Sequence, residues 1–334
     1  MLRCARHDRQ FYFPNLPTLP DATPPITSDT PAAKAAPSDL RLRVIWGVIG
    51  AVLLLGSVWF SPWTFGLFFA FVQAVMLWEF YRMMRAGGYA PATWIGVGAG
   101  TIMFVAIWVR CFSNGMYVNG VKGEFAASEW ASLFDQTETI TLPLAIATLF
   151  LLPIILVVRE MRQWPQEKQP FTNVAIILLG LLYISLPMAM LNMLPFVHNK
   201  GFFPLRVFGL LFLVWASDIG AYAVGRTFGK RKLAPKISPG KTWEGWAGGF
   251  VMTLLVGWAI GFMLPDVPLL HRLVAAGVVA IFAPLGDLAE SMLKRSVGVK
   301  DSGSIMPGHG GLLDRFDAFL LVLPVLALLQ LLAG

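Results

Sequence analysis

The sequence predicts an all-α integral membrane protein of about nine transmembrane helices, with its amino terminus in the cytoplasm. Hydrophobic residues make up 56% of the 334 residues, and the mean hydropathy is +0.66. Charged residues make up 13%, about half of the ~25% that a soluble protein uses to cover its surface. The apolar residues gather in nine segments, and most of these reach the ~20 residues that a helix needs to cross ~30 Å of hydrocarbon.

The nine predicted helices are separated by loops that carry most of the charge. The first segment is short, and the third contains four glycines or prolines. The segments lie near residues 44–60, 64–84, 91–109, 140–158, 173–194, 206–224, 243–264, 271–289 and 313–333.

The distribution of basic residues supports the count and the orientation. With a cytoplasmic amino terminus, nine crossings place residues 1–43, 82–90, 159–172, 225–242 and 290–315 inside. These stretches hold 21 of the 26 lysines and arginines, as the positive-inside rule requires. Omitting one central helix would destroy this asymmetry. The net charge of +7 therefore reflects membrane topology and does not indicate a nucleic-acid partner.

The amino-terminal residues 1–43 are predicted to form a disordered cytoplasmic tail. Residues 14–37 include seven prolines among small polar residues, too little apolar surface to offset the entropy of ordering. The tail has no apolar stretch that would form a cleavable signal peptide. Cys4 and Cys111 lie far apart and indicate no disulfide or metal framework.

Charged side chains are unusually dense between the last two apolar segments. One face of the eighth predicted helix carries polar residues at i, i+3, i+4 and i+7, and the ninth opens with two aspartates at i and i+3. These residues are Asp287, Glu290, Ser291 and Lys294, then Asp314 and Asp317. Carboxylates from two helix ends suit Mg²⁺, whose coordination is completed by substrate phosphates and water. The alternative is that each acid pairs with a nearby lysine or arginine at the interface.

A second polar region runs from the sixth predicted helix through a basic loop to the start of the seventh. Asp218 and Tyr222 share a helix face, and the loop 225–242 supplies six basic residues, hydroxyls and glycines. Backbone amides at a helix start, with Lys241, Ser238 and Thr242 alongside, can bind phosphate. A basic cytoplasmic loop can also be only a topology signal.

A third feature is the segment Pro307–Gly311, in which three glycines surround His309. Glycine allows the backbone to approach a ligand closely. His309 could act as a general base, a donor to phosphate or a cap for the last helix.

Together these residues resemble the phosphatidate cytidylyltransferase (CDP-diacylglycerol synthase) family. Its signature spans residues 291–317 here with matching spacing, and Met306 stands where the family usually has Leu, Ile or Phe. The matching residues are Ser291, Lys294, Arg295, Lys300, Asp301, His309, Gly310, Gly311, Asp314, Arg315 and Asp317. The resemblance is specific over roughly residues 205–320, whereas the first four helices match only in hydropathy.

The resemblance implies a magnesium-dependent reaction of CTP with phosphatidate that yields CDP-diacylglycerol and pyrophosphate. It also implies a catalytic transmembrane region over residues 201–334, following amino-terminal transmembrane helices over 44–200. The enzyme would be a multi-pass protein of the cell (inner) membrane, with its active site on the cytoplasmic side. Whether two copies form a homodimer stays open, because the sequence locates no interface.

Each candidate residue receives a provisional role. Asp287 and Asp314 are expected to be the main Mg²⁺ ligands, with Asp218 and Asp317 as further ligands for this or a second cation. The expected catalytic residues are Asp287, Asp314, Lys294, Arg295, Lys300, Asp301, His309 and Arg315. The expected substrate-binding residues are Asp218, Tyr222, Ser238, Lys241, Thr242, Ser291, Gly310 and Gly311.

Two other functions fit part of the pattern. A CTP-dependent polyprenol or lipid kinase would also need nucleotide and metal. A cation-coupled transporter could use Asp218 and Asp287 as ion sites, but no repeat relates residues 44–194 to 206–333. The lack of a DGxxAR segment followed by spaced aspartates argues against a CDP-alcohol phosphatidyltransferase.

Overall fold

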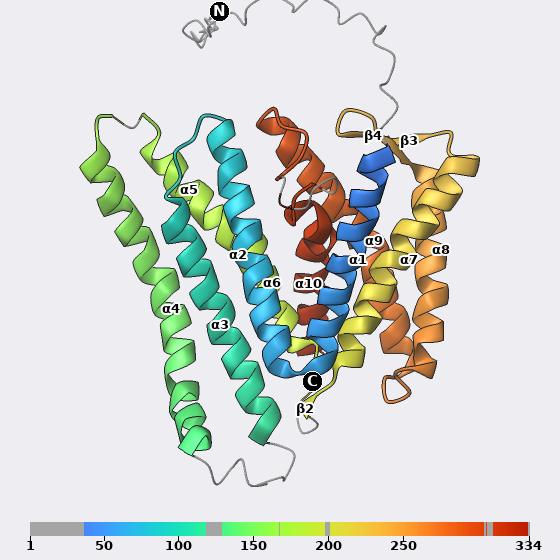
Figure 1. Ribbon diagram of the computed structural model, residues 1–334, viewed down its shortest axis with the longest axis horizontal. Helices are drawn as coiled ribbons and strands as arrows, with labels where there is room; N and C mark the ends of the chain where they lie inside the picture. Colours follow the sequence, from blue (N-terminus) through green and yellow to red (C-terminus); the bar gives the residue numbers. More distant parts are fainter. Residues whose placement is uncertain are drawn as a thin grey trace, which may run out of the picture.

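The computed structural model describes residues 37–117, 129–166, 168–197, 201–303, 305 and 310–332. Long helices stand side by side and form a bundle (Figure 1). They are α1 (Pro37–Phe60), α2 (Pro62–Ala86), α3 (Thr93–Tyr117), α4 (Glu129–Gln163), α7 (Pro204–Phe228), α8 (Trp243–Ala259), α9 (Leu269–Ser296) and α10 (Leu313–Leu332). A composite helix joins α4 to α7 and consists of α5 (Pro170–Gly180), η1 (Leu181–Ser185), α6 (Leu186–Met190) and η2 (Leu191–Met193).

The chain is a multi-pass membrane protein. Six helices of the described part are long and apolar enough to cross a bilayer, and Val44–Phe60 is a shorter apolar helix. The six spans are Pro62–Ala86, Thr93–Ser113, Pro170–Met193, Pro204–Phe228, Trp243–Phe262 and Leu269–Ser296. Each of the nine predicted segments coincides with a helix or with the composite helix.

The structure departs from the sequence prediction in three places. The stretch 110–139, between the third and fourth predicted helices, is helical at both ends, because α3 continues to Tyr117 and α4 begins at Glu129. The fifth segment is irregular: the π-helical turn η1 precedes Pro187, which has no N–H for the carbonyl of residue 183. The predicted tail lies outside the described residues except for 37–43, which belong to α1.

The all-α prediction also omits two short hairpins. Strand β1 (Phe196–Val197) pairs antiparallel with β2 (Gly201–Phe202). Strand β3 (Lys232–Ala234) pairs antiparallel with β4 (Ser238–Thr242), with Lys232 opposite Thr242. The second hairpin contains most of the predicted basic loop and lies at the same end of the bundle as the end of α2 (Figure 1).

Glycines bring the backbones of α7 and α8 close together. A Cβ added to Gly220 would lie 2.8 Å from the Gly248 carbonyl oxygen, and one added to Gly249 would lie 2.7 Å from the Ser217 carbonyl oxygen. Small residues at helix contacts are a common packing device in membranes, where van der Waals contact replaces the hydrophobic drive between helices. This packing fixes Asp218, next to Ser217, relative to the start of α8.

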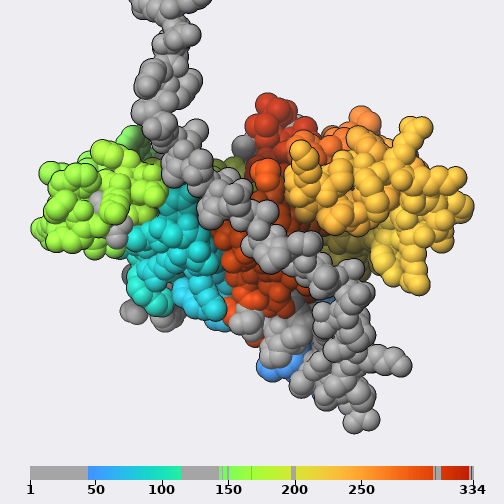
Figure 2. All heavy atoms as spheres, turned by 90° about the horizontal axis from the view of Figure 1, so that it is seen from above, coloured from blue at the N-terminus to red at the C-terminus, as the bar shows by residue number. Residues whose placement is uncertain are grey.

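A similar contact joins α9 to α10. A Cβ on Gly286 would lie 2.5 Å from the Asp317 carbonyl oxygen and 3.0 Å from the Ala318 Cα. The close approach brings Asp287 beside the first turn of α10. Seen from this end, the late part of the chain occupies the middle, between the α2–α3 block and the α7–α8 block (Figure 2).

Candidate active site

Three carboxylates from three helices form the first half of the site, here called the outer acidic group. They are Asp218 of α7, Asp287 of α9 and Asp317 of α10, and electrostatic repulsion couples all three. Lys241 of β4 lies among them, with its Nζ 2.6 Å from Asp287 Oδ2. The Asp287 side chain remains 45% exposed, so it can still reach a ligand.

Lys241 is held in place by contacts with α9 around Pro284, which lies inside that helix. Pro284 has no N–H to donate to the Ala280 carbonyl, and Trp246 Nε1 donates to that carbonyl instead at 3.1 Å. Lys241 Nζ donates to the Pro284 carbonyl at 3.2 Å. The hairpin and α8 therefore attach directly to the part of α9 that carries Asp287.

A second polar cluster, the inner group, lies on the other part of the same α9 face. Lys294 Nζ is 2.5 Å from Glu290 Oε2 and 2.8 Å from Asp314 Oδ1. Asp314 Oδ2 accepts the backbone N–H groups of Gly311 (2.9 Å) and Ser302 (3.2 Å). Asp314 is thereby fully engaged by protein donors.

That Asp287 and Asp314 share Mg²⁺ stays a prediction. The α10 carboxylate whose charge is repelled by that of Asp287 is Asp317, three residues after Asp314. The described residues contain no group of three His, Cys, Asp or Glu side chains that could hold a metal ion. Mg²⁺ does not require three, because one or two carboxylates with phosphate and water complete its octahedron. The outer acidic group, with three coupled acids beside Lys241, fits that requirement.

The start of α8 is stabilised by its own side chains. Thr242 is the N-cap and accepts the Gly245 N–H at 3.1 Å, and its residue is only 6% exposed. Glu244 accepts the backbone N–H groups of Lys230 and Arg231 and so fixes the preceding loop. The contact predicted between Thr242 and substrate remains a prediction, as does that of Ser238, which lies half-buried in β4.

Comparison with known proteins gives this geometry a context. Residues 41–332 match the model of the cytidylyltransferase family. The chain belongs to the cytidylyltransferase family. It is 32% identical over 292 residues to phosphatidate cytidylyltransferase of Bacillus subtilis, which covers 86% of this chain and 96% of the relative. The enzyme of the same name from Haemophilus influenzae is 30% identical over 297 residues, 85% of this chain and 96% of the relative. The one from Pseudomonas aeruginosa is 46% identical over 130 residues, 38% of this chain and 48% of the relative.

Several predicted site residues of this cytidylyltransferase lie near the two groups. Ser291 Oγ is 3.4 Å from Asp287 Oδ1, and Gly310 adopts φ +81° beside Asp314. Tyr222 is exposed, and its hydroxyl oxygen accepts a hydrogen bond from Arg226 Nη1 at 2.9 Å. Arg295, Lys300, Asp301 and Arg315 are exposed at the same end. His309 lies outside the described residues.

Sequence reasoning missed two buried carboxylates. The sequence analysis places Glu290 on the polar face of the eighth predicted helix without a role, and it assigns no role to Glu79. Glu290 is 1% exposed and Glu79 is 0% exposed. Burying an acidic side chain inside an apolar helix costs free energy, so an acid at such a position could have been read from the sequence as a candidate functional residue.

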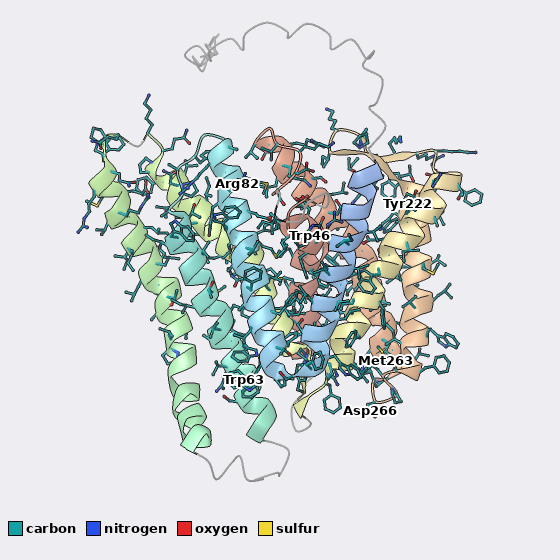
Figure 3. All side chains as sticks on the ribbon, viewed as in Figure 1. Trp46, Trp63, Arg82, Tyr222, Met263 and Asp266 are labelled. Atoms are coloured by element: carbon teal, nitrogen blue, oxygen red, sulfur yellow. The ribbon has the colours of Figure 1, made fainter. Side chains whose placement is uncertain are left out.

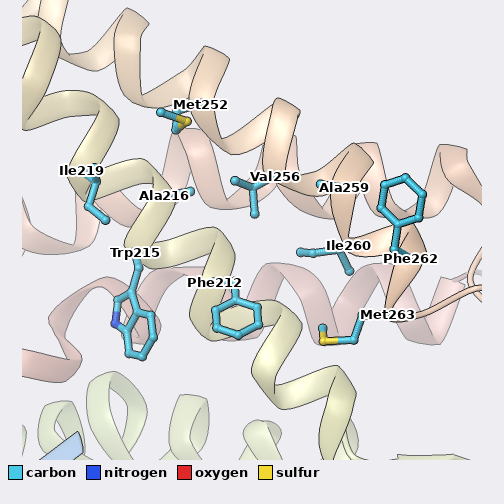
Figure 4. Close-up of a pocket in the computed structure, with 10 residues that line it drawn as sticks. All are labelled: Phe212, Trp215, Ala216, Ile219, Met252, Val256, Ala259, Ile260, Phe262 and Met263. Atoms are coloured by element: carbon cyan, nitrogen blue, oxygen red, sulfur yellow. The ribbon is translucent and has the colours of Figure 1, made fainter.

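An apolar groove of about 620 Å³ runs along α7 and α8, and its described lining is entirely apolar (Figure 4). Phe212, Trp215 and Ile219 line it from α7, and Met252 and Val256 line it from α8. Such a lining suits hydrocarbon.

Proposed function

We propose that this protein transfers the cytidylyl group of CTP to phosphatidate, releasing pyrophosphate and forming CDP-diacylglycerol. The observation that carries the proposal is the similarity to enzymes named phosphatidate cytidylyltransferase over nearly their whole length. The gathering of acidic and basic side chains at one end of a helical membrane bundle supports it, because an anionic nucleotide and an anionic headgroup must meet there.

In the proposed reaction, a phosphate oxygen of phosphatidate attacks the α-phosphorus of CTP. The new P–O bond forms as the bond from the α-phosphorus to the bridging oxygen breaks, and pyrophosphate carries away the electron pair. The second pKa of a phosphate monoester is about 6, so the nucleophile is already anionic and no strong base is needed. The protein has to align two polyanions and neutralise the leaving group.

We assign Asp287 and Asp317, with Asp218 nearby, as the residues that would hold Mg²⁺. A bound Mg²⁺ would supply charge neutralisation at phosphate oxygens. Lys241 fixes Asp287 and offers a cation to phosphate. Lys294, Arg295, Lys300 and Arg315 are assigned to phosphate binding, and Asp314 to orienting Lys294.

The proposed topology has nine crossings with a cytoplasmic amino terminus, in the inner membrane. The distribution of lysine and arginine supports it, because all predicted basic loops then lie with the active site on the cytoplasmic side. The soluble nucleotide could then reach a headgroup whose acyl chains stay in the bilayer.

Position-specific labelling of CTP tests the reaction. We expect α-³²P label to enter the lipid phase with phosphatidate and Mg²⁺, and γ-³²P label to appear only in pyrophosphate. A lipid kinase would give the reverse distribution, with γ-label in lipid. Diacylglycerol, which lacks the phosphate nucleophile, is the matched control substrate and should take up no label. Cation flux in proteoliposomes without nucleotide would instead favour the transporter.

Removal of divalent cations gives a second test. EDTA is expected to lower label transfer to background, and excess Mg²⁺ should restore it, because three coupled carboxylates cannot approach triphosphate without a counter-ion. Full activity after exhaustive chelation would contradict the assignment of Asp287 and Asp317.

A further inference from the structure

Glu79 is a carboxylate in the part of the chain where the family signature has no residue. It lies near the end of α2 and is 0% exposed. Its Oε2 accepts the Leu313 backbone N–H at 2.9 Å, at the amino terminus of α10. Ser302 Oγ donates to the same oxygen at 3.5 Å. A charge from the amino-terminal half of the protein thus meets the start of the last helix, where a helix dipole favours an anion.

Two glycines pack so closely against the Glu79 carboxylate that neither has room for a side chain of its own. A Cβ on Gly303 would lie 2.2 Å from Glu79 Oε1, and a Cβ on Gly311 would lie 2.6 Å from Oε2. Gly303 and Gly311 both belong to the connection between α9 and α10 (residues 297–312), here called the signature loop. Two parts of that loop therefore close around one side chain of α2.

Ser302, which bonds Glu79 through its hydroxyl, also bonds Asp314 through its backbone N–H. The backbone N–H groups of Ser302 and Gly311 both donate to Asp314 Oδ2, and Asp314 Oδ1 accepts Lys294 Nζ. A continuous set of contacts leads from Glu79 through Ser302 and Gly311 to Asp314 and Lys294. Contact between α2 and α10 completes it.

We propose that Glu79 is a positioning residue for the reaction. It orders the ends of the signature loop and the first turn of α10, and thereby orients Asp314 and Lys294 toward substrate phosphate. A leucine or glutamine would fill the same space without the cost of a buried charge, so packing alone does not account for an acid here. The inference rests on the proposed function, because orientation matters only if these groups act on substrate.

The test compares Glu79→Gln with Gln73→Leu in the labelled-CTP assay. Gln73 is a matched control: it is also on α2 and 0% exposed, but it bonds Ser185 and not the signature loop. We expect Glu79→Gln to lower kcat about 10–100-fold with KM for CTP within about threefold, as for a small misplacement of reacting groups. Gln73→Leu should keep kcat within about threefold of the wild type, even if its melting temperature falls as much as that of Glu79→Gln.

Equal kcat losses in the two variants, or a kcat for Glu79→Gln close to the wild type, would overturn the inference. If Glu79→Gln does not fold, Ser302→Ala provides the test, because it removes the hydroxyl that bonds Glu79 and leaves Glu79 itself in place. Its kcat should fall several-fold, and an unchanged kcat would reject the role. If the wild-type protein labelled no lipid, the proposed function itself would be refuted, and this outcome is distinct from the results for the Glu79 and Ser302 variants.

Discussion

Replacing Asp287 with Asn is expected to lower CTP-dependent labelling of lipid about 1,000-fold, in the range seen when a central electrostatic group is lost. Asp287 belongs to the outer acidic group: its Oδ2 lies 2.6 Å from Lys241 Nζ, and its charge repels those of Asp218 and Asp317. Asn keeps the shape and removes the charge. Because Asp287 is half exposed and repelled by two neighbours, the variant should fold as well as the wild type.

The measurement is initial rate against CTP concentration for purified Asp287→Asn, beside its melting temperature in the same detergent. Asp266→Asn is the control, because Asp266 lies at the opposite end of the bundle (Figure 3). We expect the control to retain activity within about twofold. Near-normal turnover in folded Asp287→Asn would reject Asp287 as a centre of the site.

Replacing Gly286 with Ala is expected to reduce both stability and activity, although Gly286 itself bears no functional group. The new Cβ would lie 2.5 Å from the Asp317 carbonyl oxygen and 3.0 Å from the Ala318 Cα, and both are backbone atoms. Since carbon contacts settle near 3.5–4.0 Å, α9 and α10 would have to separate by roughly 1 Å. Overpacking of this kind costs about 1–3 kcal/mol, and a shift of ~1 Å between Asp287 and Asp317 should cost about 100-fold in rate.

The same helix offers a matched control for Gly286→Ala. A Cβ on Gly277 would meet nothing within 4 Å, so Gly277→Ala changes the same residue type without a clash. We expect it to raise stability slightly, by up to ~1 kcal/mol from helix propensity, at unchanged activity. Thermal unfolding and label transfer measured on both variants provide the comparison. If the two variants behaved alike, close packing of α9 on α10 would not be what positions the carboxylates.

Hydropathy and charge were enough to locate the helices, because the bilayer demands long apolar segments and leaves charge to their ends. Thr242 as the start of α8 could likewise be read from the chain, since a threonine N-cap acts through local contacts. The π-helical turn before Pro187 and the β3–β4 hairpin were not predicted. Both depend on how neighbouring helices pack, which no local pattern records.

By itself, the sequence determined the helical membrane architecture, the family signature and the end of the bundle at which its charges gather. These follow from local composition and spacing. Only the tertiary structure decided which charges meet: Asp287 with Lys241 and Asp317, Lys294 with Asp314 and Glu290, and Glu79 with the start of α10. The physical reason is that such contacts join residues up to 234 positions apart in the chain, and close glycine contacts between α7 and α8 and between α9 and α10 decide how near these helices approach.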